Sequence, residues 1–503
     1  MTKFLGQHNF HNQHLKRYFL IIIFFCLCAV ILFFNSIRFM MPLGYGGLYA
    51  LMSEQISANH FLLPSEVPFY GPGGIPFAYP PLAFYVMAFG VQLMDVTTIT
   101  YLRFAPSIFS SFSLVLVFLI ADRIIRSKIA AVIAVVLVVF SPSLYNMHIW
   151  AAGVVRGLAF LLMLCGILFL HLSMEQKGNG FAILAGLFFG LTVLTHLFYG
   201  LFFALWLFIW SGVQLNRLPW KKVFFIILMS VLLILPWVSL MVARYKWVIF
   251  LNAFSSHDNA AFIEVITTPG ILSEWIGGKF SLFSSNPFSI ILIGLGLLYL
   301  INLRQVILPL VFLPMEGSHF IELLGAICIG AGCIAMIRWS ARSKWLNYSA
   351  WGFAILVLLI HVRNGIPLVV NDAPTVDASA FDVARYVHEN IPLDSKYLFV
   401  AAQSEAEWFP YLLRREPFAS KWGSEWLGTY NDQRLLQSAI VTCRDLQSVD
   451  CLKQLPLDIT EGDFLITRKA QRKLENQLEL LPACGQRAVF GRYVVWSAEC
   501  LMN

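Results

Sequence analysis

Charged side chains are scarce in this sequence, and only 13% of its 503 residues are Asp, Glu, Lys or Arg. Soluble domains carry about 25% charged residues, so the composition excludes a wholly soluble protein. Hydrophobic residues make up 58% of the chain, aromatic residues 15%, and the mean hydropathy is +0.73. These values indicate an integral membrane protein.

The familiar motifs of soluble enzymes are also missing. The sequence has no Walker loop, no Rossmann glycine fingerprint, no HExxH segment and no Cys/His cluster with metal-ligand spacing. Gly71-Pro72-Gly73-Gly74 lacks the flanking strand and helix of a phosphate cradle, so we interpret it as a turn. The net charge of +7 comes from short Lys and Arg clusters between apolar runs, which is typical of membrane topology and not of a nucleic-acid surface.

Apolar runs long enough to cross a bilayer, about 20 residues, are abundant. The first, Tyr18–Ile37, carries no charge and is followed by a poor cleavage site, so we expect a retained helix and not a signal peptide. The uncharged stretch Gly178–Leu215 fits two helices joined by a turn around Thr195-His196. We predict about eleven spans; those after the first are Phe104–Ala121, Ile129–Met147, Gly157–Met174, the pair within Gly178–Leu215, Val223–Ala243, Pro287–Leu303, a pair within Gln305–Ile337, and Trp345–Val362.

Basic residues predict the orientation of these spans. With the N-terminus in the cytoplasm, every predicted inner loop contains Lys or Arg, as the positive-inside rule expects. These residues are Arg123, Arg126, Lys128, Lys177, Arg217, Lys221, Lys222, Arg304, Arg338, Arg342 and Lys344. An odd number of spans then places the tail outside the cytoplasm.

The cysteines fall into two groups. Five lie in apolar runs, where we expect small core residues, and Cys443, Cys451, Cys484 and Cys500 lie in the polar tail. Four cysteines allow three pairings, of which 443–451 with 484–500 is the most local; four free thiols are the alternative. Disulfides persist outside the reducing cytosol, which agrees with the predicted orientation.

The chain divides into two predicted parts. Residues 1–362 form a helical membrane domain with long external loops at 38–103 and 244–286, and residues 363–503 form a soluble extracytoplasmic α/β domain. In the second part, we predict strands at Tyr397–Ala401, Asp463–Thr467 and Tyr493–Ser497, and helices after Asp377 or Ser379 and at Arg468–Leu478.

The first external loop contains an amphipathic segment. Its apolar residues fall on one helical face and its polar residues on the other, so we expect an interfacial helix with its polar face toward water. The apolar face is Leu48, Leu51, Met52 and Ile56, and the polar face is Ser53, Glu54, Ser57 and His60. Pro80-Pro81 starts a second short helix, Leu82–Met94.

Several short motifs resemble those of the GT-C glycosyltransferases, the protein mannosyltransferase-like and aminoarabinose transferase-like membrane enzymes that use polyprenyl-phosphate sugars. The similar segments are Gly44-Tyr45-Gly46-Gly47-Leu48-Tyr49, Ile75-Pro76-Phe77-Ala78-Tyr79-Pro80-Pro81-Leu82-Ala83-Phe84-Tyr85, Gly153-Val154-Val155-Arg156, Leu194-Thr195-His196, Glu407-Trp408-Phe409-Pro410 and Gly423-Ser424-Glu425-Trp426. The sequence departs from the family where an Asp normally precedes the interfacial helix, because Gly46-Gly47 stands there. Either Glu54 or Glu66 replaces that acid, or the usual chemistry is lost.

The resemblance implies roles for the ionisable residues near the outer surface. The general base for an inverting transfer is Glu54 or Glu66, because a single displacement needs one carboxylate. Cationic groups that stabilise the lipid-phosphate leaving group are Arg156, His196, Lys279 and Arg103, and substrate-binding candidates are His60, Tyr79 and His148. The resemblance implies a lipid-phosphate sugar as the donor substrate and no definite cofactor, and it leaves a divalent metal open.

The resemblance therefore predicts transfer of a sugar from a polyprenyl-phosphate donor to an extracytoplasmic lipid, glycan or protein, in a bacterial cytoplasmic (inner) membrane. The alternatives are a non-catalytic, degenerate GT-C scaffold and a lipid or glycan transporter. Transporters favour ionisable residues at mid-membrane, whereas the predicted spans here carry almost none.

Overall fold

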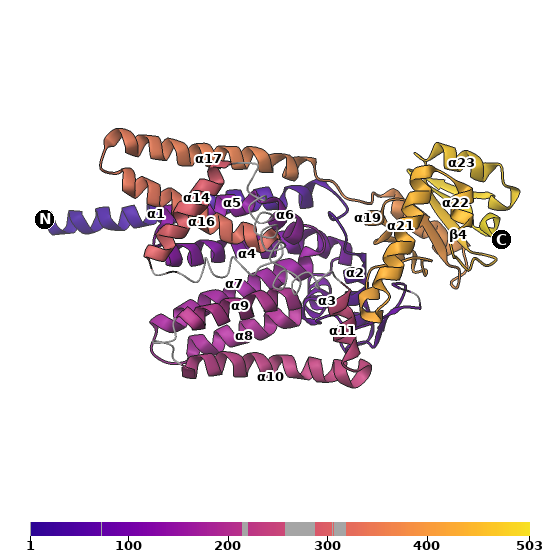
Figure 1. The fold of residues 1–503 in the computed structure, drawn as a ribbon, viewed down its shortest axis with the longest axis horizontal. Coiled ribbons are helices and arrows are strands. Elements are labelled where there is room, and N and C mark those ends of the chain that lie inside the picture. Colours follow the sequence, from indigo (N-terminus) through magenta and orange to yellow (C-terminus); the bar gives the residue numbers. More distant parts are fainter. Residues whose placement is uncertain are drawn as a thin grey trace, which may run out of the picture.

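The computed structural model describes residues 2–71, 73–213, 220–256, 287–303, 305 and 318–502. A long helix bundle carries the N-terminus at one end, and a smaller region with a β-sheet lies at the opposite end (Figure 1). Lys279 and the rest of residues 257–286 lie outside the described part, as do residues 306–317 of the predicted pair within Gln305–Ile337.

Most of the described bundle consists of apolar helices. Six contain a stretch long and apolar enough to cross a membrane: α1 (Thr2–Arg38), α4 (Thr98–Ile125), α7 (Gly153–Glu175), α10 (Trp220–Tyr245), α16 (Ser318–Ser340) and α17 (Lys344–Asn371). Shorter apolar helices are α8 (Gly180–Thr195), α9 (Leu197–Val213) and α14 (Pro287–Asn302). The structure confirms the helical membrane protein, and the hairpin divides at His196 as predicted, whereas the count of eleven spans stays a prediction.

The predicted span Ile129–Met147 is wrong in shape, because two helices replace it. Helix α5 (Lys128–Val139) and helix α6 (Pro142–Ile149) meet at a bend of 66°. The carboxylate of Glu322 on α16 caps α6 by accepting hydrogen bonds from the backbone N–H of Ser143 at 2.9 Å and of Leu144 at 3.2 Å. The N–H groups that a helix start leaves without partners are thereby satisfied, so the break is stable inside the bundle.

Loop one folds into α2 (Gly47–Ala58), a short antiparallel pair of β1 (Glu66–Val67) and β2 (Ile75–Pro76), and α3 (Leu82–Met94). The prediction that the polar face of α2 meets water holds for Ser57 and His60, which are exposed, and is wrong for Ser53, which is only 2% exposed. The Glu54 carboxylate contacts Tyr411 and Arg414 at the end of α20 (Phe409–Leu413). The C-terminal region covers this part of the face, which hydropathy along the chain does not reveal.

The C-terminal region contains a four-stranded sheet in the order β3 (Tyr397–Val400), β4 (Phe464–Arg468), β6 (Tyr493–Ser497) and β5 (Gln486–Phe490). The β3–β4 pair is parallel and the other pairs are antiparallel. The three predicted strands are present, and β5 was not predicted. The helices and 3-10 turns of this region are α18 (Ser379–Asn390), α19 (Gln403–Ala406), α20, η2 (Ser424–Leu427), α21 (Tyr430–Leu446), α22 (Val449–Lys453), α23 (Arg472–Glu479), η3 (Pro482–Cys484) and η4 (Glu499–Leu501).

Two connections fix this region covalently. Disulfides join Cys443 of α21 to Cys451 of α22, and Cys484 of η3 to Cys500 of η4. On the membrane side, α17 continues to Asn371, beyond the span end predicted at Val362.

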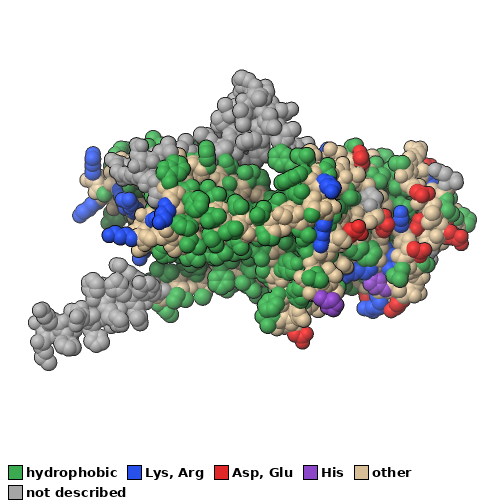
Figure 2. All heavy atoms as spheres, turned by 90° about the horizontal axis from the view of Figure 1, so that it is seen from below, with side chains coloured by type: hydrophobic (Ala, Val, Ile, Leu, Met, Phe, Trp, Pro, Cys, Tyr) green, Lys and Arg blue, Asp and Glu red, His purple; other side chains and the backbone are tan. Residues whose placement is uncertain are grey.

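The surface separates by chemistry along the long axis. Figure 2 shows hydrophobic side chains over the middle of the bundle, Lys and Arg gathered at the end nearest the N-terminus, and most of the acidic side chains toward the other end. On α10, Phe224 is 58% and Leu232 55% exposed, which fits a surface solvated by lipid. This distribution supports the assignment as an integral membrane protein.

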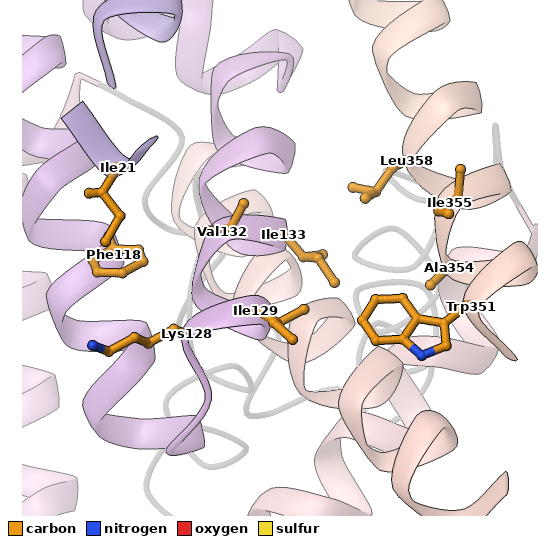
Figure 3. Close-up of a pocket in the computed structure, with 10 residues that line it drawn as sticks. All are labelled: Ile21, Phe118, Lys128, Ile129, Val132, Ile133, Trp351, Ala354, Ile355 and Leu358. Carbon is orange, nitrogen blue, oxygen red and sulfur yellow. The ribbon is translucent and has the colours of Figure 1, made fainter. Parts of the chain in front are cut away.

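An apolar cavity of about 260 Å³ opens between α1, α4, α5 and α17. Figure 3 shows Ile21 and Phe118 on one side, Ile129 on α5, and Trp351 and Leu358 of α17 on the other. Lys128 is the charged residue of its lining. This lining suits a hydrocarbon chain and offers no set of groups for catalysis.

Candidate functional site

Arg156, in the first turn of α7, lies among tyrosines from loop one. Its guanidinium donates a hydrogen bond to the Tyr45 hydroxyl at 2.5 Å and lies 5.4 Å from the centre of that ring. The Tyr45 ring stacks on Trp422 at 5.1 Å, so the C-terminal region completes this wall. Tyr49, Tyr79 and Tyr199 also lie within range of the Arg156 charge.

Three histidines gather beside these tyrosines. His148 of α6 is 3% exposed, shares a hydrogen bond of 2.6 Å with the Tyr199 hydroxyl and stacks on Phe160. The His196 ring, between α8 and α9, lies 5.2 Å from the Tyr199 ring. The His319 ring of α16 lies 5.9 Å from that of His148, and both its nitrogens are buried without a hydrogen-bond partner in the described part of the chain.

Tyr79 connects this cluster to the C-terminal region. Its ring lies 6.2 Å from the ring of His196 and 6.0 Å from that of Trp426 in η2. The charge of the neighbouring Glu425 acts on the Tyr79 phenol, whose pKa is raised, chiefly by burial and against the opposing effect of Arg156. Burial also raises the pKa of Glu425 to about 7.

The start of α2 receives a carboxylate from another part of the chain. The Glu407 carboxylate accepts hydrogen bonds from the backbone N–H groups of Gly46 at 2.8 Å, Gly47 at 2.9 Å and Leu48 at 2.8 Å. Next to it, the Trp408 indole donates to the Gly44 carbonyl at 2.8 Å. The C-terminal region therefore holds the entrance of α2 through a carboxylate and an indole.

The two predicted bases lie in different settings. Glu54 accepts a hydrogen bond from Tyr411 at 2.7 Å and pairs with Arg414. Glu66 lies exposed in β1, opposite Pro76. Their predicted catalytic role stays a prediction, because the contacts described here place them with Arg414 and with the β1–β2 pair.

The remaining predicted residues divide in the same way. Arg156, His148, His196 and Tyr79 converge on one cluster. Arg103 donates to the Met40 carbonyl at 3.3 Å and lies over the Phe104 ring, while His60 is exposed after the end of α2. Lys279 is outside the described residues.

Sequence reasoning missed five members of the cluster. Tyr45, Tyr49 and Glu425 lie within the family-like segments but received no role, and Tyr199 follows the family-like Leu194-Thr195-His196. His319 lies within Gln305–Ile337, where a pair of spans was predicted. A search for aromatic and ionisable residues at the predicted outer helix ends would have included His319. The contribution of Glu425 required the tertiary structure.

The cluster offers a cation, several phenols, imidazoles and a buried carboxyl at the end of an apolar bundle. Such a set can bind an anionic headgroup while the bundle binds its lipid chain. Within the described ranges, no three His, Cys, Asp or Glu side chains converge as they would around a metal ion.

Comparisons with known proteins place this geometry in context. Residues 67–253 match the family model described as dolichyl-phosphate-mannose-protein mannosyltransferase. A search of curated proteins finds no significant match. The matched segment contains Tyr79, His148, Arg156, His196 and Tyr199.

Solved structures extend the likeness to nearly the whole chain. ArnT from Cupriavidus metallidurans bound to undecaprenyl phosphate is 14% identical with a TM-score of 0.53, covering 95% of this chain and 97% of that protein. The apo state of the same protein is 13% identical with a TM-score of 0.57, covering 96% of this chain and 98% of that protein. A third structure is the oligosaccharyltransferase AglB from Archaeoglobus fulgidus in complex with an inhibitory peptide and a dolichol-phosphate. It is 14% identical with a TM-score of 0.57, covering 90% of this chain and 70% of that protein. The chain therefore shares the fold of these glycosyltransferase structures, and its residues 67–253 match the mannosyltransferase family model.

Proposed function

We propose that this protein transfers a sugar from a polyprenyl-phosphate donor to an acceptor on the extracytoplasmic side of the membrane. The observation that carries the proposal is Arg156, held by Tyr45, whose ring stacks on Trp422 of the C-terminal region. A lipid-linked phosphate needs a cation beside its headgroup and an apolar surface for its chain. Solved relatives with this fold bind undecaprenyl phosphate and dolichol-phosphate.

The donor phosphate lies beside Arg156 in this proposal. When the bond between the sugar and the phosphate breaks, the phosphate gains negative charge, and a fixed cation stabilises that change. His148, His196 and His319 all pack against Tyr199 beside this place. Both ring nitrogens of His319 are without a hydrogen-bond partner among the described residues, and they supply hydrogen-bonding capacity there. The tyrosines exclude water and orient the headgroup.

The proposed orientation places the N-terminus in the cytoplasm and the C-terminal region outside. Two observations support it: the basic side chains gather at the N-terminal end of the bundle, and the C-terminal region carries two disulfides (Figure 2). In this orientation the cluster lies at the extracytoplasmic end of the bundle. Alkaline phosphatase fused after Asn503 should be active, and an inactive fusion would contradict the orientation.

The scaffold alternative rests on one specific observation. Gly46-Gly47 replaces the family acid, and the carboxylate nearest to it, Glu407, is occupied by three backbone N–H groups. A protein without a base would still bind the lipid phosphate. Binding and transfer must therefore be measured separately.

The test uses the full chain in proteoliposomes with radiolabelled undecaprenyl-phosphate mannose or undecaprenyl-phosphate arabinose, and membrane extract as the source of acceptors. We expect transfer by the wild type, and a loss of 10²-fold or more in Arg156→Gln because one preorganised donor is removed. The matched control is Arg363→Gln, an exposed arginine of α17. Binding without transfer of either sugar by the wild type would favour the scaffold.

A further inference from the structure

Glu425 lies on a short turn that is fixed on both sides. The turn η2 is flanked by Gly423 and Gly428, whose φ values of +81° and +76° are in the left-handed region that glycine adopts easily. A side chain at position 423 would collide with Ile75 of β2. Because residue 423 is glycine, η2 can pack closely against β2 in loop one.

Trp426 anchors the same turn. Its indole is 5% exposed and belongs to a small core with Ala78, Trp237, Met241 and Ile249. The side-chain amide of Asn252 in α11 (Val248–Ser255) donates to the Trp426 carbonyl at 3.5 Å. The packing of Trp426 therefore fixes the position of Glu425, the residue before it, where η2 contacts Tyr79.

Tyr79 brings Glu425 into the range of the cluster. The Tyr79 ring lies 6.0 Å from the ring of Trp426, the residue next to Glu425 in the chain. The charges of Glu425 and of Arg156 both act on the Tyr79 phenol, with opposite effects on its pKa. Since Arg156 marks the proposed phosphate position, Glu425 approaches the headgroup region from the side of the C-terminal region. An acceptor sugar or hydroxyl that enters from the aqueous phase meets this side first.

The other acids of this area are already engaged. Glu54 pairs with Arg414, Glu405 pairs with Arg468, and Glu407 caps α2. Within the described part of the chain, Glu425 forms no ion pair.

We propose that Glu425 is the general base of the transfer, and this inference rests on the proposed function. The acceptor O–H gives its proton to the Glu425 carboxylate while the acceptor oxygen forms a bond to the anomeric carbon. The bond from that carbon to the phosphate oxygen breaks, and the polyprenyl phosphate leaves with the electron pair. The base thus comes from the C-terminal region and replaces the acid absent at Gly46-Gly47.

The ionisation of Glu425 suits this role. Burial raises the pKa of Glu425 to about 7. Hydrogen bonds from the backbone N–H groups of Glu425 and Gly423 lower this pKa, but their effect is smaller than that of burial. The elements packed on η2 present few other titratable groups: α11 and β2 have none, and α21 begins with Tyr430, Asp432 and Arg434. Beyond these, Tyr79 and Arg156 face the same region. A base with a pKa near the working pH is the efficient choice.

The experiment compares Glu425→Gln, Glu425→Asp and the exposed control Glu461→Gln in the proteoliposome assay, with transfer measured from pH 5 to 9. We expect the wild-type rate to rise with pH to a plateau with a midpoint near 7. In Glu425→Gln, kcat should be 10²- to 10⁴-fold lower than in the wild type, and the rate should no longer rise with pH. The KM for the donor should be nearly unchanged. Glu425→Asp should restore part of the rate, and Glu461→Gln should behave as the wild type.

A second measurement does not depend on turnover. Dicyclohexylcarbodiimide modifies protonated carboxyls, so its labelling of Glu425, followed by mass spectrometry, should fall with a midpoint near pH 7. A midpoint near 4, or a wild-type rate in Glu425→Gln, would overturn the base assignment and leave the proposed function standing. Failure of the wild type to transfer either sugar would overturn the proposed function and this inference with it.

Discussion

The carboxylate of Glu407 caps the helix that begins at Gly47, although 360 positions separate the two residues in the chain. One of its oxygens accepts the N–H groups of Gly46 and Gly47, and the other accepts that of Leu48. Carboxylates are favoured at helix N-termini because of the partial positive charge there. Thus the C-terminal region supplies a negative charge at the N-terminus of α2.

Removal of this cap should destabilise the protein. In Glu407→Ala, three N–H groups lose their acceptor in a buried place, at a cost of about 1–3 kcal/mol for a group left unsatisfied. Glu407→Gln should cost less, because the amide oxygen still accepts. Thermal unfolding in detergent measures both, with Glu461→Gln as the control, and an unchanged Tm in Glu407→Ala would contradict the cap.

Gly47 should not tolerate a side chain. A Cβ there would lie 2.7 Å from the Tyr70 hydroxyl oxygen and 2.8 Å from the Glu407 carbonyl oxygen, so Gly47→Ala should cost about 1–3 kcal/mol. Gly47→Asp, which restores an acid to this position, should be worse because its charge lies beside Glu407. Gly352→Ala is the matched control, since its Cβ meets open space within α17. Equal stability of the two alanine variants would refute the tight fit.

The ion pair between Glu54 and Arg414 should contribute little to stability. Its side chains are 35% and 32% exposed, and such pairs contribute less than about 1 kcal/mol. A double-mutant cycle with Glu54→Gln and Arg414→Gln measures the coupling. If Glu425 is the base, both variants should transfer sugar at similar rates. A 10²-fold loss confined to Glu54→Gln would return the base to Glu54, the earlier sequence-based hypothesis.

Glu425 should make stability depend on pH in a predictable direction. Its folded pKa of about 7 exceeds the ordinary value of 4.5, so the folded state binds the proton more tightly than the unfolded state. The contribution of this residue is therefore fully present below about pH 4.5 and is lost as pH rises through 7. Glu425→Gln should be more stable than the wild type at pH 8 by up to about 3 kcal/mol. Tm measured against pH tests this, and parallel curves for the two proteins would contradict it.

The two disulfides should be detectable and should stabilise the C-terminal region. Peptide mapping under non-reducing conditions should recover Cys443 with Cys451 and Cys484 with Cys500. The second pair closes the longer loop, with a sequence separation of 16, and its replacement by serines should cost about 3 kcal/mol. Recovery of four free thiols would contradict both the pairing and the extracytoplasmic location.

Local patterns in the sequence predicted many of the helices and strands. Short segments of sequence are enough to show a long apolar run, the break at Thr195-His196, and the strand signals of β3, β4 and β6. The structure has these elements at nearly the predicted places. The bend between α5 and α6 escaped prediction because its stabilising group, Glu322, comes from a helix almost 180 residues away. The β5 strand was missed because its pairing partner, β6, defines it.

The candidate site shows the same division. Arg156, His148, His196 and Tyr79 were found because each is an ionisable or aromatic residue at a predicted outer helix end or in loop one. The engagement of Glu54 by Arg414 and the approach of Glu425 to Tyr79 depend on how the C-terminal region rests on loop one. Composition and periodicity contain no information about that contact.

The sequence by itself determined the environment of this protein, because long apolar helices satisfy their own backbone hydrogen bonds in a bilayer and their composition is visible along the chain. Only the tertiary structure decided which acid lies near Tyr79 and which acids serve other contacts. The physical reason is that a carboxyl's role depends on its partners and on its burial, and here both come from segments hundreds of residues apart.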